Sequence, residues 1–127
     1  MIRLSKSTIT LAEKQAVMNV LEHEHLGMGE EVRQFEEKLS IFFGRPAICV
    51  VNGTAALHLA CQAVGLKAGD EVLVPSLTYI ASFQAISATN AKPVACDIDP
   101  NTLTFNWRDA EKRLTSKTKA IMPVHYA

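Results

Sequence analysis

The amino-acid sequence predicts an α/β fold in which helices flank a mainly parallel sheet. After residue 45, short apolar runs that favour strands lie at 46–51, 71–75, 93–96 and 119–124. Segments with helical character lie between them, at 55–66, 80–89 and 106–114. This alternation is typical of parallel sheets, because the chain has to cross over the sheet between one parallel strand and the next.

Two further helices are expected before the first strand. The first, over 10–25, opens with Thr10 and Glu13 at the spacing of a capping box. The second, over 30–43, ends at Gly44. Its apolar residues are three or four positions apart and so share one face: Val32, Phe35, Leu39 and Phe42.

The elements after residue 45 each carry a local signal. The run at 46–51 is continuously apolar and rich in β-branched residues, which predicts a strand buried on both sides. The Ala- and Leu-rich helix that follows closes at Gly65, and Gly69-Asp70 forms the next turn. Asn106 is expected to cap the last helix, with Asp109 in its first turn.

Composition excludes several classes of partner. The chain has 127 residues and equal numbers of basic and acidic residues, 13 of each, so no global field attracts nucleic acid or an anionic membrane. No apolar run reaches the roughly 18–20 residues of a membrane span, and the N-terminus is too polar for a secretory signal. The three cysteines lack metal-site spacing and indicate buried free thiols in the cytoplasm, with no metal expected: Cys49, Cys61 and Cys96.

The turn after the first predicted strand, Asn52-Gly53-Thr54, is a candidate anion site. Gly53 allows a ligand to approach the backbone, Thr54 offers a hydroxyl, and the following helix starts with free N–H groups. These features suit a phosphate. The turn has neither a Walker loop nor a GxGxxG pattern, and by itself it is more typical of a tight turn with Thr54 as helix cap.

Two other strand ends carry polar or aromatic side chains. Tyr79 follows the second strand, where its ring is available to a planar cofactor or simply to solvent. Asp97 and Asp99 follow the third strand. One of these carboxylates is available to a ligand hydroxyl, but two acids around Ile98 are more typical of turn formers.

In order and spacing, the motifs of this chain are similar to the opening of the DegT/DnrJ/EryC1/StrS aminotransferases. The resemblance covers nearly the whole chain. It rests on Gly29, Phe35-Glu36, Asn52-Gly53-Thr54-Ala55-Ala56-Leu57, Gly69-Asp70-Glu71-Val72, Pro75-Ser76-Leu77-Thr78-Tyr79, Pro93-Val94, Asp97-Ile98-Asp99, Lys117-Thr118-Lys119-Ala120-Ile121 and Pro123-Val124-His125.

The resemblance implies the aspartate-aminotransferase-like architecture, fold type I, of enzymes that use pyridoxal 5'-phosphate (PLP). Residues 1–127 would then be one partial domain, with N-terminal helices at 1–44 and the first part of the PLP-binding large domain at 45–127. By position, Gly53 and Thr54 resemble the family's phosphate-binding pair and Tyr79 the aromatic residue that stacks on the pyridine ring.

The family's substrates and assembly carry over in the same way. The resemblance implies a homodimer that moves an amino group, usually from glutamate, to a keto group of a nucleotide-linked sugar. The loop Gly27-Met28-Gly29 resembles the one near the sugar. His125 lies near the cofactor cleft, without an assigned role.

The family's cofactor-binding lysine, in a Ser-x-His-x-x-Lys motif, does not occur here and is expected beyond residue 127. The chain is therefore interpreted as an inactive piece of an aminotransferase. Four alternatives stay open. Two are of the same family, a dehydratase and a non-sugar aminotransferase. The others are a non-catalytic dimerisation or partner module and a Rossmann-type dinucleotide binder, which the missing glycine pattern disfavours.

Overall fold

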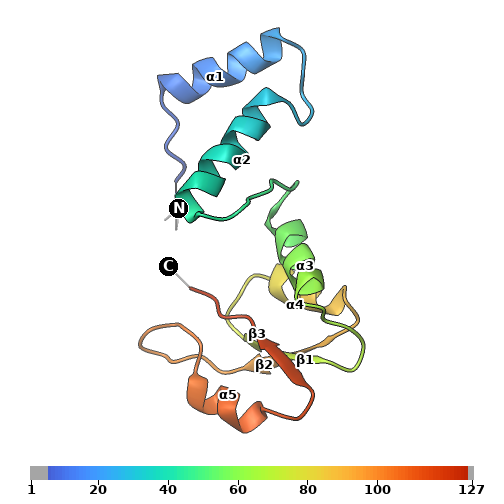
Figure 1. Ribbon diagram of the computed structural model, residues 1–127. Helices are drawn as coiled ribbons and strands as arrows, with labels where there is room; N and C mark the ends of the chain where they lie inside the picture. The colour runs from blue at the N-terminus through green and yellow to red at the C-terminus, as the bar shows by residue number, and fades with distance from the viewer. Residues whose placement is uncertain (1–5, 126–127) are drawn as a thin grey trace. The chain divides into compact units, whose positions relative to one another are not determined.

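The structure is a computed structural model that describes residues 6–125 (Figure 1). The chain divides into two compact units, one up to Cys49 and one from Val50 onward. No helix among the described residues is long and apolar enough to cross a bilayer.

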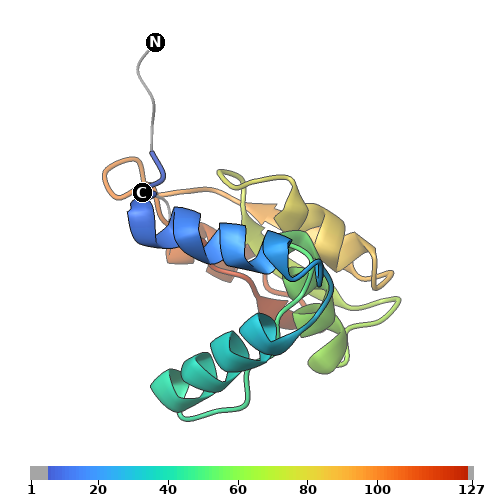
Figure 2. The ribbon, with the colours of Figure 1, turned by 90° about the horizontal axis from the view of Figure 1, so that it is seen from above.

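The first unit consists of two helices, α1 (Leu11–Glu22) and α2 (Glu30–Phe43), which diverge from the turn that joins them (Figure 2). The predicted capping box of α1 is confirmed, since the Thr10 backbone N–H donates to Glu13 Oε2 over 2.6 Å and the Thr10 side chain accepts in return. The predicted bounds of α2 are also confirmed. Gly44 ends it in the left-handed conformation, with φ of 62°, which glycine adopts without steric cost.

The strand predicted at 46–51 does not form, and this prediction was wrong. A strand requires a neighbour for its backbone groups, and none of the described strands pairs with this segment. Instead, the N–H groups of Ala47 and Cys49 donate to side chains of α2, Ser40 Oγ at 2.9 Å and Glu36 Oε1 at 2.6 Å. The segment is exposed rather than buried on both sides, with Ile48 76% and Val51 88% accessible.

The second unit is a parallel sheet between two layers of helix. Along the chain it contains α3 (Gly53–Ala63), β1 (Glu71–Pro75), α4 (Ala81–Ser87), β2 (Lys92–Cys96), α5 (Trp107–Arg113) and β3 (Thr118–Ile121). The strand order is β2-β1-β3, and β1 is parallel to both neighbours. The predicted α/β class with a parallel sheet is therefore confirmed.

Alternate residues of β1 face opposite helix layers, as the two-residue period of a strand requires. Val72 and Val74 belong to a core formed with α3 and α4, whereas Leu73 packs with Cys96 and with Ala110 of α5. Figure 1 shows the same layers, with α3 and α4 on one side of the sheet and α5 on the other. The second crossover runs back past β1, and right-handed crossovers in opposite directions place their helices on opposite faces.

Most predicted elements of the second unit are present with shifted ends. Helix α3 begins at Gly53, before the predicted 55, because the side chain of Asn52 caps it by accepting from the Ala55 N–H. Strand β3 ends at Ile121, short of the predicted 124. Helix α4 is shorter than the predicted 80–89, and Asn106 caps α5 as expected.

A buried carboxylate, Glu71, joins the starts of the strands. Its side chain accepts from Thr115 Oγ1 over 2.7 Å and pairs with Lys92 Nζ over 3.1 Å. The Thr115 hydrogen bond and the Lys92 ammonium hold the pKa of Glu71 below its usual range. Since Lys92 begins β2 and Thr115 precedes β3, this one side chain connects the amino ends of all three strands.

We predict that Glu71 makes the free energy of unfolding depend on pH in the acid range. A carboxyl group with a lowered folded-state pKa stabilises the fold fully above the ordinary glutamate pKa of about 4.3 and loses that contribution as pH falls toward the lowered value. Glu71→Gln should therefore flatten the fall of the urea midpoint between about pH 6 and about pH 3. Glu111→Gln, at an exposed position of α5, is the matched control. Equal acid sensitivity in wild type and Glu71→Gln would contradict the assignment.

Candidate functional site

The first turn of α3 carries two free backbone donors. Asn52 is the N-cap of α3. Its side-chain oxygen accepts from the Ala55 N–H over 2.9 Å, and its backbone carbonyl accepts from the Ala56 N–H over 3.2 Å. The preceding N–H groups, of Gly53 and Thr54, have no acceptor among the described residues. Free amides at a helix start, at the positive end of the helix dipole, are suited to an anion.

The space beside Gly53 is open. A Cβ built at this position meets no heavy atom within 4 Å, so the fold itself would accept a side chain there. A glycine nevertheless leaves the backbone uncovered and lets an anion approach the amides. The turn therefore fits a phosphate-sized group, and Asn52 rather than Thr54 serves as helix cap, which corrects the simple-turn interpretation of the sequence.

A groove of about 430 Å³ runs from this turn along the contact between α3 and α4. Helix α3 contributes Asn52, Thr54, Ala55 and His58, and α4 contributes Gln84, Ala85 and Ala88. Its α4 side is largely alanine. The sequence analysis did not single out His58 or Gln84. The spacing of four residues between Thr54 and His58 was the available signal, because it places both on one face of the helix.

Tyr79 lies between β1 and α4, with 78% of its surface accessible. Its carbonyl accepts from the Ser82 N–H over 3.1 Å, and the hydroxyls of Thr78 and Ser82 are 2.8 Å apart. These bonds fix the backbone around Tyr79 and leave the ring free for a planar ligand. Tyr79 does not line the groove beside Thr54, so a single site that includes Gly53, Thr54 and Tyr79 stays a prediction.

The strand ends after β2 and β3 lie at the same edge of the sheet as Tyr79, since all three strands are parallel. Both carboxylates after β2 accept hydrogen bonds from nearby backbone: Asp97 Oδ1 from the Ile98 N–H over 2.8 Å, and Asp99 Oδ1 from the Asn101 N–H over 2.8 Å. The interpretation as a turn former is thus confirmed for Asp99, but not for Asp97, whose bond to the adjacent amide closes no turn. His125, after β3, is exposed.

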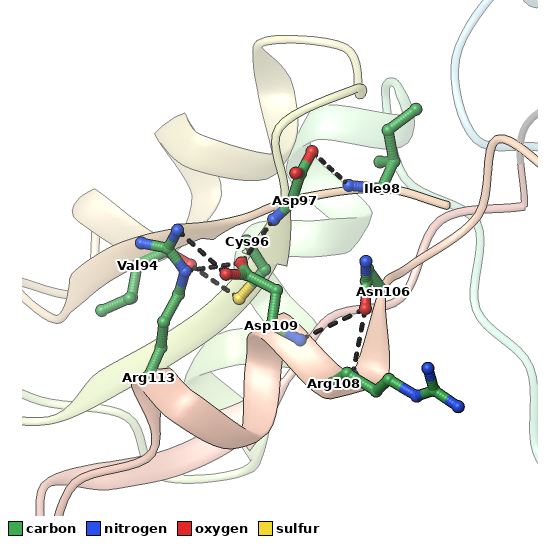
Figure 3. A network of polar contacts seen from close by, with 8 residues as sticks. All are labelled: Val94, Cys96, Asp97, Ile98, Asn106, Arg108, Asp109 and Arg113. Carbon is green, nitrogen blue, oxygen red and sulfur yellow. Dashed lines mark hydrogen bonds and ion pairs between the residues drawn. The ribbon is translucent and has the colours of Figure 1, made fainter. Parts of the chain in front are cut away.

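A polar network anchors the end of β2 to α5 (Figure 3). The Asp97 N–H donates to Asp109 Oδ2 over 2.7 Å, and Arg113 Nε donates to the same oxygen over 2.6 Å. The hydrogen bond from Arg113, followed by that from the Asp97 amide, lowers the pKa of Asp109. Asn106 completes the network as the cap of α5, accepting from the Arg108 and Asp109 amides. These groups are engaged with one another and stabilise the fold.

In the first unit, the loop Gly27-Met28-Gly29 joins α1 to α2. A groove of about 650 Å³ lies here, and its lining includes Asn19, His23, His25, Gly27 and Gly29. The Met28 side chain is exposed. The imidazole of His25 lies directly over Gly29, because a Cβ at Gly29 would be 2.6 Å from His25 Cδ2.

The second unit is thus a parallel α/β fold in which the amides of Gly53 and Thr54 at the start of α3 have no acceptor among the described residues. The chain belongs to the DegT/DnrJ/EryC1/StrS aminotransferase family, which it matches over residues 7–127. The family resemblance inferred from the motifs is therefore confirmed.

Two curated relatives make nucleotide-linked amino sugars by name. The chain is 42% identical over 126 residues to the GDP-perosamine synthase of Escherichia coli O157:H7. This match covers 98% of the chain and 35% of the relative. It is 46% identical over 113 residues to the dTDP-3-amino-3,6-dideoxy-alpha-D-galactopyranose transaminase of Aneurinibacillus thermoaerophilus, covering 88% of this chain and 31% of the relative. The chain thus spans about a third of the length of these relatives.

The fold is similar to that of NtdA from Bacillus subtilis, solved with bound cofactor PMP. The TM-score is 0.81 at 33% identity, and the match covers 92% of this chain and 28% of that structure.

We predict that Gly29→Ala disturbs the start of α2 by displacing His25. The added methyl would overlap the imidazole ring, and alanine is also a poorer N-cap than glycine, so a loss of about 1 kcal/mol in the free energy of unfolding is expected. NMR signals of the His25 ring should shift as well. Gly27→Ala is the control, because a Cβ there meets nothing within 4 Å. If the two variants leave the His25 signals equally unchanged, the packing of His25 on Gly29 is refuted.

Proposed function

We propose that the full-length protein is a PLP-dependent aminotransferase that moves an amino group, from glutamate, to a keto group of a nucleotide-linked sugar. Membership of the aminotransferase family supports this. So do the printed names of the GDP- and dTDP-sugar relatives. The observation that carries the proposal is the first turn of α3, with two amides free for a phosphate.

The described residues offer partners for two parts of the cofactor, its phosphate and its pyridine ring. In our proposal the Gly53 and Thr54 amides bind the cofactor phosphate, and the Thr54 hydroxyl donates a further hydrogen bond to it. The uncovered backbone at Gly53 leaves room for this contact. When bound, PLP supplies an electron sink for the bond changes at the amino carbon.

The remaining roles in this chain are binding and orientation. Asn52 holds the helix start in place through its bond to the Ala55 N–H. The exposed ring of Tyr79 would restrict the plane of the pyridine ring and exclude water from one of its faces. Gly27, Met28 and Gly29 would lie near the sugar substrate, by family resemblance.

The covalent lysine is proposed to come from residues beyond 127. All eight lysines of this chain are exposed, whereas a lysine that forms a Schiff base is typically held in a desolvated site. We therefore expect residues 1–127 alone not to transaminate. We propose that the full-length protein is a homodimer in the cytoplasm. The dimer is supported by exposed apolar side chains of α1 and α2: Leu21, Phe35, Phe42 and Phe43.

We predict that the full-length protein, supplied with PLP, glutamate and a nucleotide-linked keto sugar, forms 2-oxoglutarate and the amino sugar in equal amounts. Mass spectrometry of the sugar and enzymatic assay of 2-oxoglutarate measure the two products. Omitting the keto sugar is the control. Loss of water from the sugar without consumption of glutamate would replace this proposal by the dehydratase. No turnover with any keto sugar despite PLP binding would favour the non-catalytic partner module.

We predict that Gly53→Pro weakens PLP binding about tenfold or more. Proline at the first position of a helix removes one N–H with little cost to the helix, and the extended conformation of Asn52, φ −165° and ψ 171°, is compatible with a following proline. A hydrogen bond to a charged group contributes about 1.5–3 kcal/mol. Fluorescence titration measures the Kd of PLP and of pyridoxal, which lacks the phosphate.

The matched control is Leu11→Pro, which removes the amide at the same position of α1. Its Kd for PLP should equal that of wild type. If Gly53→Pro weakens pyridoxal as much as PLP, the phosphate does not bind at this turn.

A further inference from the structure

Ser82 holds the backbone on both sides of Tyr79. Its N–H donates to the Tyr79 carbonyl over 3.1 Å, and its hydroxyl oxygen lies 2.8 Å from that of Thr78, the residue before Tyr79. Only 6% of the surface of Ser82 is accessible, whereas 78% of that of Tyr79 is. A buried residue thus fixes the chain at two points around an exposed aromatic ring.

The helix that carries Ser82 is itself well anchored. Ala85 and Ile86 of α4 are buried in the core that this helix forms with β1. The residue that follows β1, Ser76, is held as well, since its N–H donates to the Cys96 carbonyl over 2.8 Å. The short connection that contains Tyr79 therefore runs between two rigid elements, which is where a binding side chain is placed most precisely.

The bond between Thr78 and Ser82 does not cap the helix. It joins two hydroxyls and satisfies no backbone N–H, and the N-cap residue of α4, Ile80, makes no capping bond with its side chain. Replacing two hydrogen-bonded partners by apolar groups of the same shape can be nearly neutral for stability. The pair of hydroxyls therefore contributes mainly direction, because it fixes the position of residue 78 relative to α4.

We propose that Ser82 is a positioning residue for the cofactor ring, acting through Thr78 on the orientation of Tyr79. An aromatic ring stacks well only in specific relative orientations of the two planes, and a loop that becomes ordered on binding reduces affinity through lost conformational entropy. With residues 78 and 79 held before the ligand arrives, only the side-chain torsions of Tyr79 remain to be fixed. This inference rests on the proposed function, because it assumes that Tyr79 faces a bound pyridine ring.

The test measures the Kd of PLP and of pyridoxal in the full-length protein. Ser82→Ala removes the hydroxyl and keeps the N–H, and alanine is a better helix former than serine, so α4 should still form. We expect both Kd values to rise by the same factor, roughly two- to fivefold, within the range of one neutral hydrogen bond, because the two ligands share the pyridine ring. Ser87→Ala, at an exposed serine at the other end of α4, is the matched control and should leave both values unchanged.

Variants of Thr78 test the same bond from its other side. Thr78→Val keeps the shape of the side chain and removes the hydroxyl. It should reproduce the effect of Ser82→Ala, and the two changes together should weaken binding no more than either alone. Thr78→Ser retains the hydroxyl and should bind both ligands like wild type. Because Thr78 is only half-buried, these two variants decide the question even if Ser82→Ala does not fold.

A second readout separates positioning from packing. If Ser82 acts through Tyr79, then Ser82→Ala should have no further effect in a Tyr79→Ala background, because the ring that it orients is absent. Induced circular dichroism of the cofactor, measured at saturating PLP, reports how rigidly the ring is held. This signal should weaken in Ser82→Ala and in Thr78→Val but not in Thr78→Ser.

Each outcome has one meaning. A full Ser82→Ala effect in the Tyr79→Ala background, or a loss of affinity for PLP alone, overturns the positioning role while the proposed cofactor stands. Unchanged Kd values in both Ser82→Ala and Thr78→Val, or in Tyr79→Ala, overturn it too. If the wild-type protein binds neither PLP nor pyridoxal, the proposed function fails as well. Equal loss of affinity for the two ligands together with non-additivity supports the inference.

Discussion

The second unit depends on strand β1 being satisfied on every side. Both of its edges are hydrogen-bonded, to β2 and to β3, and both of its faces are covered by helices. All five of its residues are buried, including Glu71 at its start. Once β1 is placed in this way, α4 and α5 have to lie on opposite faces, and the three carboxyl ends have to meet at one edge. The candidate site residues Tyr79, Asp97 and His125 therefore share this edge.

The sequence predicted best those elements whose ends are encoded locally. Helix α2 has the predicted bounds because Gly44 permits a left-handed stop that other residues resist. The start of α5 was predictable because Asn106 caps its own following amides. The start of α3 was missed by two residues because Asn52 was treated as part of a turn, although its side chain performs the same capping as Asn106.

Properties that depend on distant parts of a chain could not be predicted in this way. The apolar run at 46–51 has the composition of a strand, but composition does not specify a partner, and the Glu36 and Ser40 side chains bind its amides instead. The candidate site was predictable where residues follow strands or open helices, as Gly53, Thr54 and Tyr79 do. His58 was not, because a histidine within an Ala- and Leu-rich helix resembles ordinary core until the structure reveals its unsatisfied nitrogen.

The cap of α3 has a thermodynamic consequence for any anion that binds there. The Asn52 side chain accepts from the third N–H of the helix, that of Ala55, and the Asn52 carbonyl accepts from the fourth, that of Ala56. The helix start is therefore already ordered by internal hydrogen bonds. The two remaining amides therefore stand in a fixed orientation before a ligand arrives. Association then loses little conformational entropy in the protein, and more of the electrostatic attraction is expressed as affinity. A preorganised turn of this kind favours slow dissociation over adaptability to ligands of different shape.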